Sequence, residues 1–194
     1  MTHASRLCGK AALVVAFLVA VTPGFAADSD GRYSVEGPGR QKCSSFLSLA
    51  QDSREYAISA GYVSGYLSAS NALASDTFDI TPWQTLELSL LQIRQFCEGN
   101  PEASLAEGMV QYTAFLMPWR IASHEDKTSL RVGEKVVVQY QSVIERMRAS
   151  LKEKGFGSDD EPLDGLKDYQ LSIGVEPTGL PDQSTLTQLF SQTR

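Results

Sequence analysis

The amino-acid sequence predicts an all-α protein made of two small helical domains: an N-terminal bundle held by a disulfide and a C-terminal bundle of three helices. Through most of the chain after residue 43, apolar residues recur at the spacing of an amphipathic helix. Prolines and glycines stand where these helices would begin and end. No segment has a convincing strand or hairpin pattern, so we expect no sheet.

Residues 1–26 have the pattern of a secretory signal peptide. Two basic residues, Arg6 and Lys10, precede an apolar run from 11 to 21. Helix breakers and the small residues Ala26 and Ala27 follow it. The run is too short to cross a bilayer core of about 30 Å, which needs roughly 20 apolar residues. We therefore expect cleavage after Ala26 and a periplasmic product without later membrane insertion; an uncleaved anchor is the alternative.

The mature chain is acidic. Cleavage removes Arg6 and Lys10 but no acid, so the formal net charge changes from −6 to −8. This balance argues against a nucleic-acid partner, because phosphates require a basic face. The remaining 168 of 194 residues suit one medium domain or two small ones.

Two cysteines, Cys43 and Cys97, remain after cleavage. An even number of cysteines in an exported chain indicates a disulfide. Each cysteine also lies on the apolar face of its predicted helix, Cys43 with Phe46 and Cys97 with Ile93. We therefore predict a Cys43–Cys97 disulfide between two packed helices, with two buried free thiols as the alternative.

The N-terminal region divides into a leader and a helical domain. Residues 27–40 are polar and rich in glycine, which is typical of a flexible leader. The helical domain is expected over 41–122, followed by a charged linker over 123–133. Its first two helices are predicted from Cys43 to about Ala50 and from about Ser53 to Leu73.

The second of these helices carries small residues at every fourth position: Ala57, Gly61, Gly65 and Ala69. Glycine inside a helix costs about 1 kcal/mol relative to alanine. We therefore expect a close helix crossing at this face, where a side chain would not fit. Two further helices are predicted, one opening at Thr81-Pro82 and ending near Glu98, the other running from Asn100 to Pro118.

The C-terminal domain is expected over 134–194 and should contain three helices. The first is predicted from about Leu130 or Gly133 to Lys154, the second from about Pro162 to Ile173, and the third from Pro181 onward. Gly174 is suited to end the second helix in a left-handed conformation, and Gly179 to supply a turn residue with positive φ. Asp182 stands close enough to the last helix to cap it.

The C-terminal sequence resembles the peptidoglycan-binding-like domain, a three-helix module found beside bacterial cell-wall hydrolases. The matching elements are Tyr169-Gln170, Gly174-Val175, Thr178-Gly179, Asp182, Thr185 and Leu189. One departure is the short acidic segment 158–162, where many members carry an additional turn between the first and second helices. The resemblance implies that Tyr169, Gln170, Thr178, Gly179, Asp182 and Thr185 define the module or bind peptidoglycan.

The N-terminal domain is similar, more loosely, to small periplasmic acid-stress chaperones and to immunity proteins that protect against cell-wall amidases. The similarity lies in Cys43, Phe46, Gly61-Tyr62, Gly65-Tyr66 and Cys97. It implies a compact helical domain with one disulfide between well-separated helices.

No catalytic group is expected, because the sequence singles out no nucleophile with a base and no carboxylate pair. His124 is the one histidine after the signal peptide and no metal-ligand spacing accompanies it, so no metal or other cofactor is expected. We therefore expect a non-catalytic protein that binds peptidoglycan through 134–194 and a protein partner through 41–122. The alternatives are an acid-stress chaperone and an inhibitor or regulator of a cell-wall hydrolase.

Overall fold

The structure is a computed structural model that describes residues 28, 30, 32–157 and 163–191. The predicted signal peptide and the segment 158–162 lie outside the described residues. The chain divides into two compact units after Ser34. In the first unit the carboxylate of Asp28 accepts hydrogen bonds from the backbone and the guanidinium of Arg32, at 2.8 and 3.1 Å. The described helices and strands all lie in Val35–Arg194.

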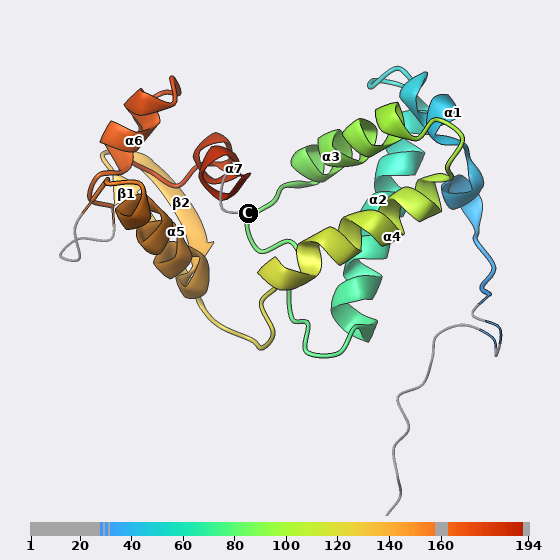
Figure 1. Cartoon of the computed structure of the whole chain (residues 1–194), viewed down its shortest axis with the longest axis horizontal. Coiled ribbons are helices and arrows are strands. Elements are labelled where there is room, and N and C mark those ends of the chain that lie inside the picture. Colours follow the sequence, from blue (N-terminus) through green and yellow to red (C-terminus); the bar gives the residue numbers. More distant parts are fainter. Residues whose placement is uncertain (1–27, 29, 31, 158–162, 192–194) are drawn as a thin grey trace, which may run out of the picture. The chain divides into compact units, whose positions relative to one another are not determined.

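The first group of elements is helical, as predicted. It consists of η1 (Gly37–Arg40), α1 (Cys43–Leu47), α2 (Arg54–Leu73), α3 (Leu86–Gly99), α4 (Leu105–Leu116) and η2 (Met117–Trp119). In Figure 1 the helices α2, α3 and α4 gather with α1 close to one end of α3. They enclose a buried apolar core that includes Phe46, Val63, Ile93 and Met109. None of the helices in the described part of the chain has the length and apolarity that crossing a bilayer requires.

Two helix starts in this group differ from the prediction. Helix α3 begins at Leu86 rather than at Thr81-Pro82, because Thr85 is the residue whose hydroxyl accepts from the N–H of Leu88, at 3.2 Å. Helix α4 begins at Leu105 rather than at Asn100. Here Ser104 and Glu107 form a reciprocal capping box, a stronger start than the Asn-Pro pair upstream.

The predicted close helix crossing at Gly61 and Gly65 is wrong. Both residues are exposed, and a Cβ atom added at either would meet nothing within 4 Å. The buried side chains of α2 are instead Ser59, Val63 and Leu67, on another face of the helix. The glycines on the exposed face therefore pack against no other part of the chain that the structure describes.

The end of the predicted flexible leader is folded. Residues 37–40 form η1, and Gly39 within it is buried. A Cβ atom at Gly39 would overlap the ring of Tyr62 and lie 2.6 Å from a methyl carbon of Val35. The leader therefore ends in a turn that packs tightly against α2.

The prediction of an all-α fold is wrong for residues 127–140, which form an antiparallel hairpin. Strand β1 (Lys127–Val132) pairs with β2 (Lys135–Tyr140), and Val132 faces Lys135 across the turn. Gly133 opens the two-residue loop with a φ of +60°, and a run of three valines follows in β2. A glycine-first loop and β-branched residues both favour a hairpin over the helix predicted here. Part of the predicted linker, 123–133, is thus strand β1.

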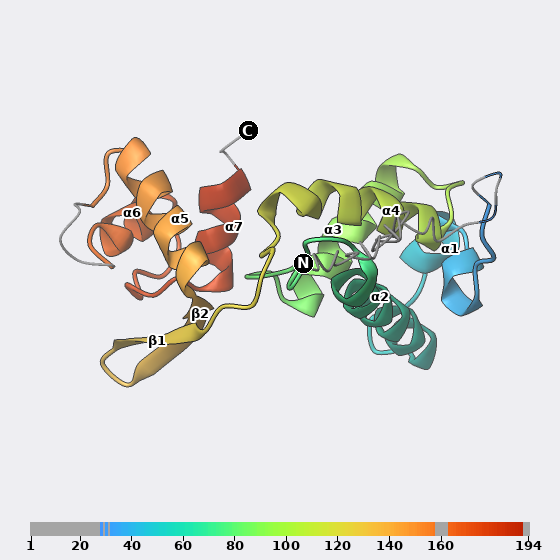
Figure 2. The same cartoon turned by 90° about the horizontal axis from the view of Figure 1, so that it is seen from below.

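The remaining elements are the three helices α5 (Gln141–Glu153), α6 (Leu166–Ser172) and α7 (Gln183–Ser191). Helix α5 starts at Gln141, later than predicted, because the hairpin occupies the preceding residues. Figure 2 shows β1 and β2 leading directly into α5. The buried side chains of these elements form a second core, which includes Val143, Met147, Tyr169, Leu186 and Leu189.

Candidate functional site

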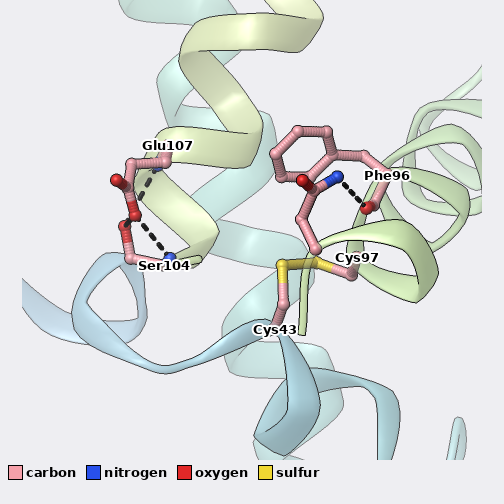
Figure 3. The surroundings of a disulfide bond; sticks show 6 residues. Cys43, Phe96, Cys97, Ser104 and Glu107 are labelled. Atoms are coloured by element: carbon pink, nitrogen blue, oxygen red, sulfur yellow. Dashed lines mark hydrogen bonds between the residues drawn. A yellow bond between two sulfur atoms is a disulfide. The ribbon is translucent and has the colours of Figure 1, made fainter. Parts of the chain in front are cut away.

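The disulfide joins Cys43 at the start of α1 to Cys97 near the end of α3. The two sulfurs are 2.08 Å apart and both cysteines are fully buried. Figure 3 shows the bond close to the Ser104–Glu107 capping box that opens α4. Next to it the backbone N–H of Cys43 donates to the carbonyl of Ala103 at 2.8 Å. The predicted pairing is therefore confirmed, and it fixes α1 against α3 beside the start of α4.

In the C-terminal region, five of the six predicted module residues form one hydrogen-bond network around Gln170. Gln170 is fully buried, and its amide oxygen accepts from the N–H of Gly179 at 2.8 Å. Its amide nitrogen lies 3.0 Å from the hydroxyl oxygen of Thr178 and 2.8 Å from that of Thr185. We call Gln170, Thr178, Gly179, Asp182 and Thr185 the Gln170 network.

Asp182 closes this network and caps α7. Its carboxylate accepts from the hydroxyl of Thr178 at 3.0 Å, and from the N–H and hydroxyl of Thr185 at 2.9 and 2.7 Å. Each threonine hydroxyl therefore accepts from Gln170 and donates to Asp182. Burial alone would raise the pKa of Asp182, but the hydrogen bonds from Thr185, Ser184 and Thr178 outweigh burial and hold that pKa below its ordinary value.

Tyr169 stands apart from the network. Its side chain is 2% exposed and packs edge-on against Phe156, with ring centres 5.4 Å apart. Burial raises the pKa of Tyr169, and its hydroxyl has no hydrogen-bond partner in the described part of the chain. Tyr169, Gln170 and Thr185 are thus all enclosed in the fold, where their side chains hold the module together.

The Gln170 network positions the Thr178–Gly179 turn at the edge of an open polar pocket of about 350 Å³. The pocket is lined by Val132, Leu163, Asp164, Gly165, Lys167, Asp168 and Gly179. We call it the Lys167 pocket. Gly179 has a φ of +70°, and a Cβ atom there would lie 2.8 Å from Cε of Lys167. Glycine is therefore required at this turn for both its conformation and its space.

The sequence pattern named Gly179 but missed Lys167 and Asp168, two of the three charged residues that line this pocket. Both are exposed, polar residues of a helix, and nothing distinguishes them from other surface positions in the sequence. Their role as pocket residues depends on the end of β1 meeting the start of α6, and no strand was predicted at that position. Of the pocket residues, only Gly179 could be predicted locally, because its turn needs a positive φ that favours glycine.

The described residues contain no group of three or more histidine, cysteine, aspartate or glutamate side chains placed to hold a metal ion. His124 is exposed and lies edge-on to Phe78, with ring centres 5.0 Å apart. Comparison of the chain with models of known protein families, with curated proteins and with solved structures found no match.

Proposed function

We propose that this is an exported, non-catalytic periplasmic protein that binds peptidoglycan through its C-terminal region and a protein partner through its N-terminal helices. The observation that carries the proposal is the Lys167 pocket, whose lining residue Gly179 is fixed by a hydrogen bond to the buried Gln170. A site supported by a locked network of buried hydrogen bonds loses little conformational entropy when it binds.

The charges of the Lys167 pocket favour the stem peptide as the part of the wall that it contacts. Lys167 supplies a cation, while Asp164 and Asp168 supply carboxylates. Stem peptides carry free carboxylates and, in many bacteria, a free amine. A pocket with both signs of charge suits such a ligand better than it suits an uncharged sugar chain.

Retention of the exported chain by purified sacculi tests this half of the proposal. We expect exchange of the charges at Lys167 and Asp168, as Lys167→Asp with Asp168→Lys, to lower the retained fraction at least fivefold. The matched control exchanges two exposed, consecutive residues of α5, as Lys152→Glu with Glu153→Lys. Both variants keep the net charge. Equal retention of the two variants would contradict a role for the Lys167 pocket.

The exposed face of α2 supports the proposed protein contact. Ala57, Gly61 and Gly65 are exposed and leave the helix backbone open, and the neighbouring Ile58 is 49% exposed. A partner's backbone can approach such a face closely, and an exposed apolar side chain beside it adds contact area. If the protein binds peptidoglycan, a cell-wall hydrolase is the favoured class of partner, because both proteins would then be bound to the cell wall.

Co-purification from an envelope extract tests the contact. We expect Gly61→Arg to abolish recovery of the partner while the fold is kept, because nothing lies within 4 Å of the added Cβ atom. Glu98→Arg, at an exposed position of α3, is the control. If Gly61→Arg and Glu98→Arg recover the same proteins as the unchanged chain, the α2 face is not the contact.

A further inference from the structure

The outer edge of strand β1 carries main-chain groups that point away from the hairpin. In a hairpin with a two-residue loop, the residues that flank the loop, here Val132 and Lys135, form a hydrogen-bonded pair. Such pairs alternate along the ladder with pairs whose N–H and C=O groups face away from the partner strand. Lys127, Ser129 and Arg131 therefore direct these groups outward, and we call the three residues the β1 edge. No group in the described part of the chain forms a hydrogen bond with them.

The side chains of the β1 edge share the solvent-facing side of the hairpin. Successive side chains of a strand alternate between its two faces. Leu130 is buried in the core, so its neighbours Ser129 and Arg131 face outward, and Lys127 lies on the same face. All three residues of the β1 edge are exposed. In Figure 2, β1 lies on the side of the hairpin away from α5. The β1 edge is therefore accessible to an incoming strand.

The strand is regular over its whole length. Its register with β2 is unbroken from Lys127 to Val132, so no bulge interrupts it, and it contains no proline. Bulges, prolines and charged side chains are the devices by which natural proteins keep an edge strand from pairing. Of these devices, only charge occurs within β1, so an added strand of the opposite charge meets no obstacle there.

The two cations of the β1 edge have no carboxylate partner among the described residues. Asp126 and Glu134 flank the strand, but neither forms an ion pair with Lys127 or Arg131. The nitrogen of Lys127 lies 4.2 Å from the centre of the Tyr140 ring, which holds this cation on the outward face. The Cα atoms of the two basic residues are about 13 Å apart, as four steps along a strand require. The β1 edge therefore presents two positive charges at a fixed spacing, in a chain whose formal net charge is −6.

We propose that the β1 edge binds an extended acidic segment of a partner polypeptide, which adds to the hairpin as a third, antiparallel strand. The residues of this segment that lie opposite Lys127, Ser129 and Arg131 exchange main-chain hydrogen bonds with them. The segment carries carboxylates opposite the two basic residues, four positions apart, and a small side chain opposite Ser129. This mode of recognition combines main-chain pairing, which gives affinity, with alternate side chains, which give specificity.

The charges disfavour a second copy of β1 as the occupant. Antiparallel pairing of two β1 strands about Ser129 would place Lys127 of each copy opposite Arg131 of the other, and like charges directly opposite one another destabilise a sheet. A nucleic acid would neutralise the cations, but it has no main chain that donates and accepts at the spacing of a strand. An acidic strand satisfies both requirements. The proposed contact is separate from the α2 face and does not depend on peptidoglycan binding.

Fluorescence anisotropy of a labelled peptide, titrated with the exported full-length chain, tests the proposal. The probe is the heptapeptide Thr-Glu-Val-Thr-Val-Glu-Thr with blocked ends, and we expect a saturable rise in anisotropy. The same peptide with both glutamates replaced by lysine should bind at least tenfold more weakly. An N-methyl group on the central threonine removes the N–H that faces Ser129 and should also weaken binding at least tenfold. An N-methyl group on the valine before it, whose N–H points away from β1, should leave binding unchanged.

Variants of the chain separate charge from main-chain pairing. Lys127→Glu with Arg131→Glu should weaken binding of the acidic probe at least tenfold and favour the lysine peptide instead. The matched control, Arg54→Glu with Lys152→Glu, changes the net charge equally at exposed helix positions and should leave binding of the acidic probe nearly unchanged. Ser129→Pro removes an outward N–H but keeps both cations and the ladder to β2, and it should weaken binding at least tenfold. Circular dichroism and melting temperature show whether each variant keeps its fold.

Four results would overturn the proposal: no rise in anisotropy with the acidic probe, equal effects of the two N-methyl groups, equal affinity of the two charge variants, or equal competition by a thymidine trinucleotide, which carries the same two negative charges. Equal effects of the N-methyl groups would mean that charge alone binds the probe, and equal competition that the site accepts any polyanion. The absence of binding would mean that Lys127 and Arg131 only protect the edge from pairing.

The outcome is independent of the proposed function, because no residue of the β1 edge lines the Lys167 pocket or belongs to α2. If the probe binds but sacculi do not retain the protein, only the proposed function falls. If sacculi retain the protein but the probe does not bind, only the β1 edge proposal falls.

Discussion

Gln170 shows how a residue in a binding-type sequence motif can have a purely structural task. Its amide is buried and contacts the backbone or side chains of Thr178, Gly179 and Thr185. The sequence resemblance singled out these residues, and the structure places most of their side chains in the interior of the C-terminal region. In the proposed function, the positions that would face a ligand are their neighbours, such as Lys167 beside Gly179.

Replacement of Gln170 should therefore destabilise the fold rather than merely weaken binding. Gln170→Leu leaves the buried N–H of Gly179 without an acceptor, and each such loss costs about 1–3 kcal/mol. We expect a loss of about 3 kcal/mol in the free energy of unfolding, measured by urea denaturation. Gln188→Leu, on the surface of α7, should change it by less than about 0.5 kcal/mol. Similar values for the two variants would mean that the network adds little stability.

Asp182 should make the stability of the module depend on pH. Its folded-state pKa lies below the ordinary value of 3.8, so its ionised form is favoured by folding. The resulting stability is fully present above the unfolded pKa and is lost as the pH falls through the lower, folded pKa. Asp182→Ala should cost about 1 kcal/mol at pH 7, as expected for a lost helix cap. The difference from the unchanged chain should shrink below pH 3.8. Urea denaturation at several pH values measures this difference in the free energy of unfolding. A difference that does not change with pH would contradict the lowered pKa of Asp182.

At the scale of elements, helices were predictable where the apolar spacing and the residue preferences agreed. The hairpin was missed because the spacing favoured a helix and the residue types favoured a strand. The helical spacing from Val136 to Leu151 is continuous, but the valines of this segment also suit a strand. The two-residue loop Gly133-Glu134 favours the strand over the helix, because it places Val132 opposite Lys135 in a hairpin. The helix starts at Leu86 and Leu105 were missed by a few residues, because several capping residues stand close together in the sequence.

Because the glycines on α2 are exposed, replacing them with alanine should stabilise the protein, whereas a close helix crossing would make the same replacements destabilising. Gly61→Ala and Gly65→Ala add a methyl group in open space within a helix. Each should raise the free energy of unfolding by about 0.5–1 kcal/mol through better helix propensity. Gly108→Ala on α4 should gain less, because a Cβ atom there would lie 3.2 Å from the ring of Phe96. Thermal denaturation distinguishes these outcomes; destabilisation by Gly61→Ala would restore the crossing model.

At the scale of the whole molecule, the sequence indicated the disulfide, the helical character and the general position of the C-terminal helices. It did not indicate the Lys167 pocket, because this pocket is lined by residues from separate elements. It combines Val132, Lys167 and Gly179 from three parts of the chain. Adjacency of this kind depends on tertiary packing, which a single sequence does not reveal.

The disulfide should supply a large share of the stability of the N-terminal helices. It links residues 54 positions apart, and closing a loop of that length contributes about 4 kcal/mol in the chain-entropy model. The paired variant Cys43→Ala with Cys97→Ala should therefore lower the free energy of unfolding by about that amount. Chemical denaturation under non-reducing conditions measures the loss, and a loss below about 1 kcal/mol would show that helix packing alone is sufficient.

The burial of both sulfurs also constrains the order of events during folding. With Cys43 and Cys97 fully enclosed, no oxidant or thiol-exchange enzyme can reach them once the surrounding core has closed. The bond must therefore form while α1 and α3 are still accessible, early in maturation. A chain that packs before it is oxidised would have to reopen this core to acquire its cross-link, so the timing of oxidation governs how much correctly matured protein accumulates.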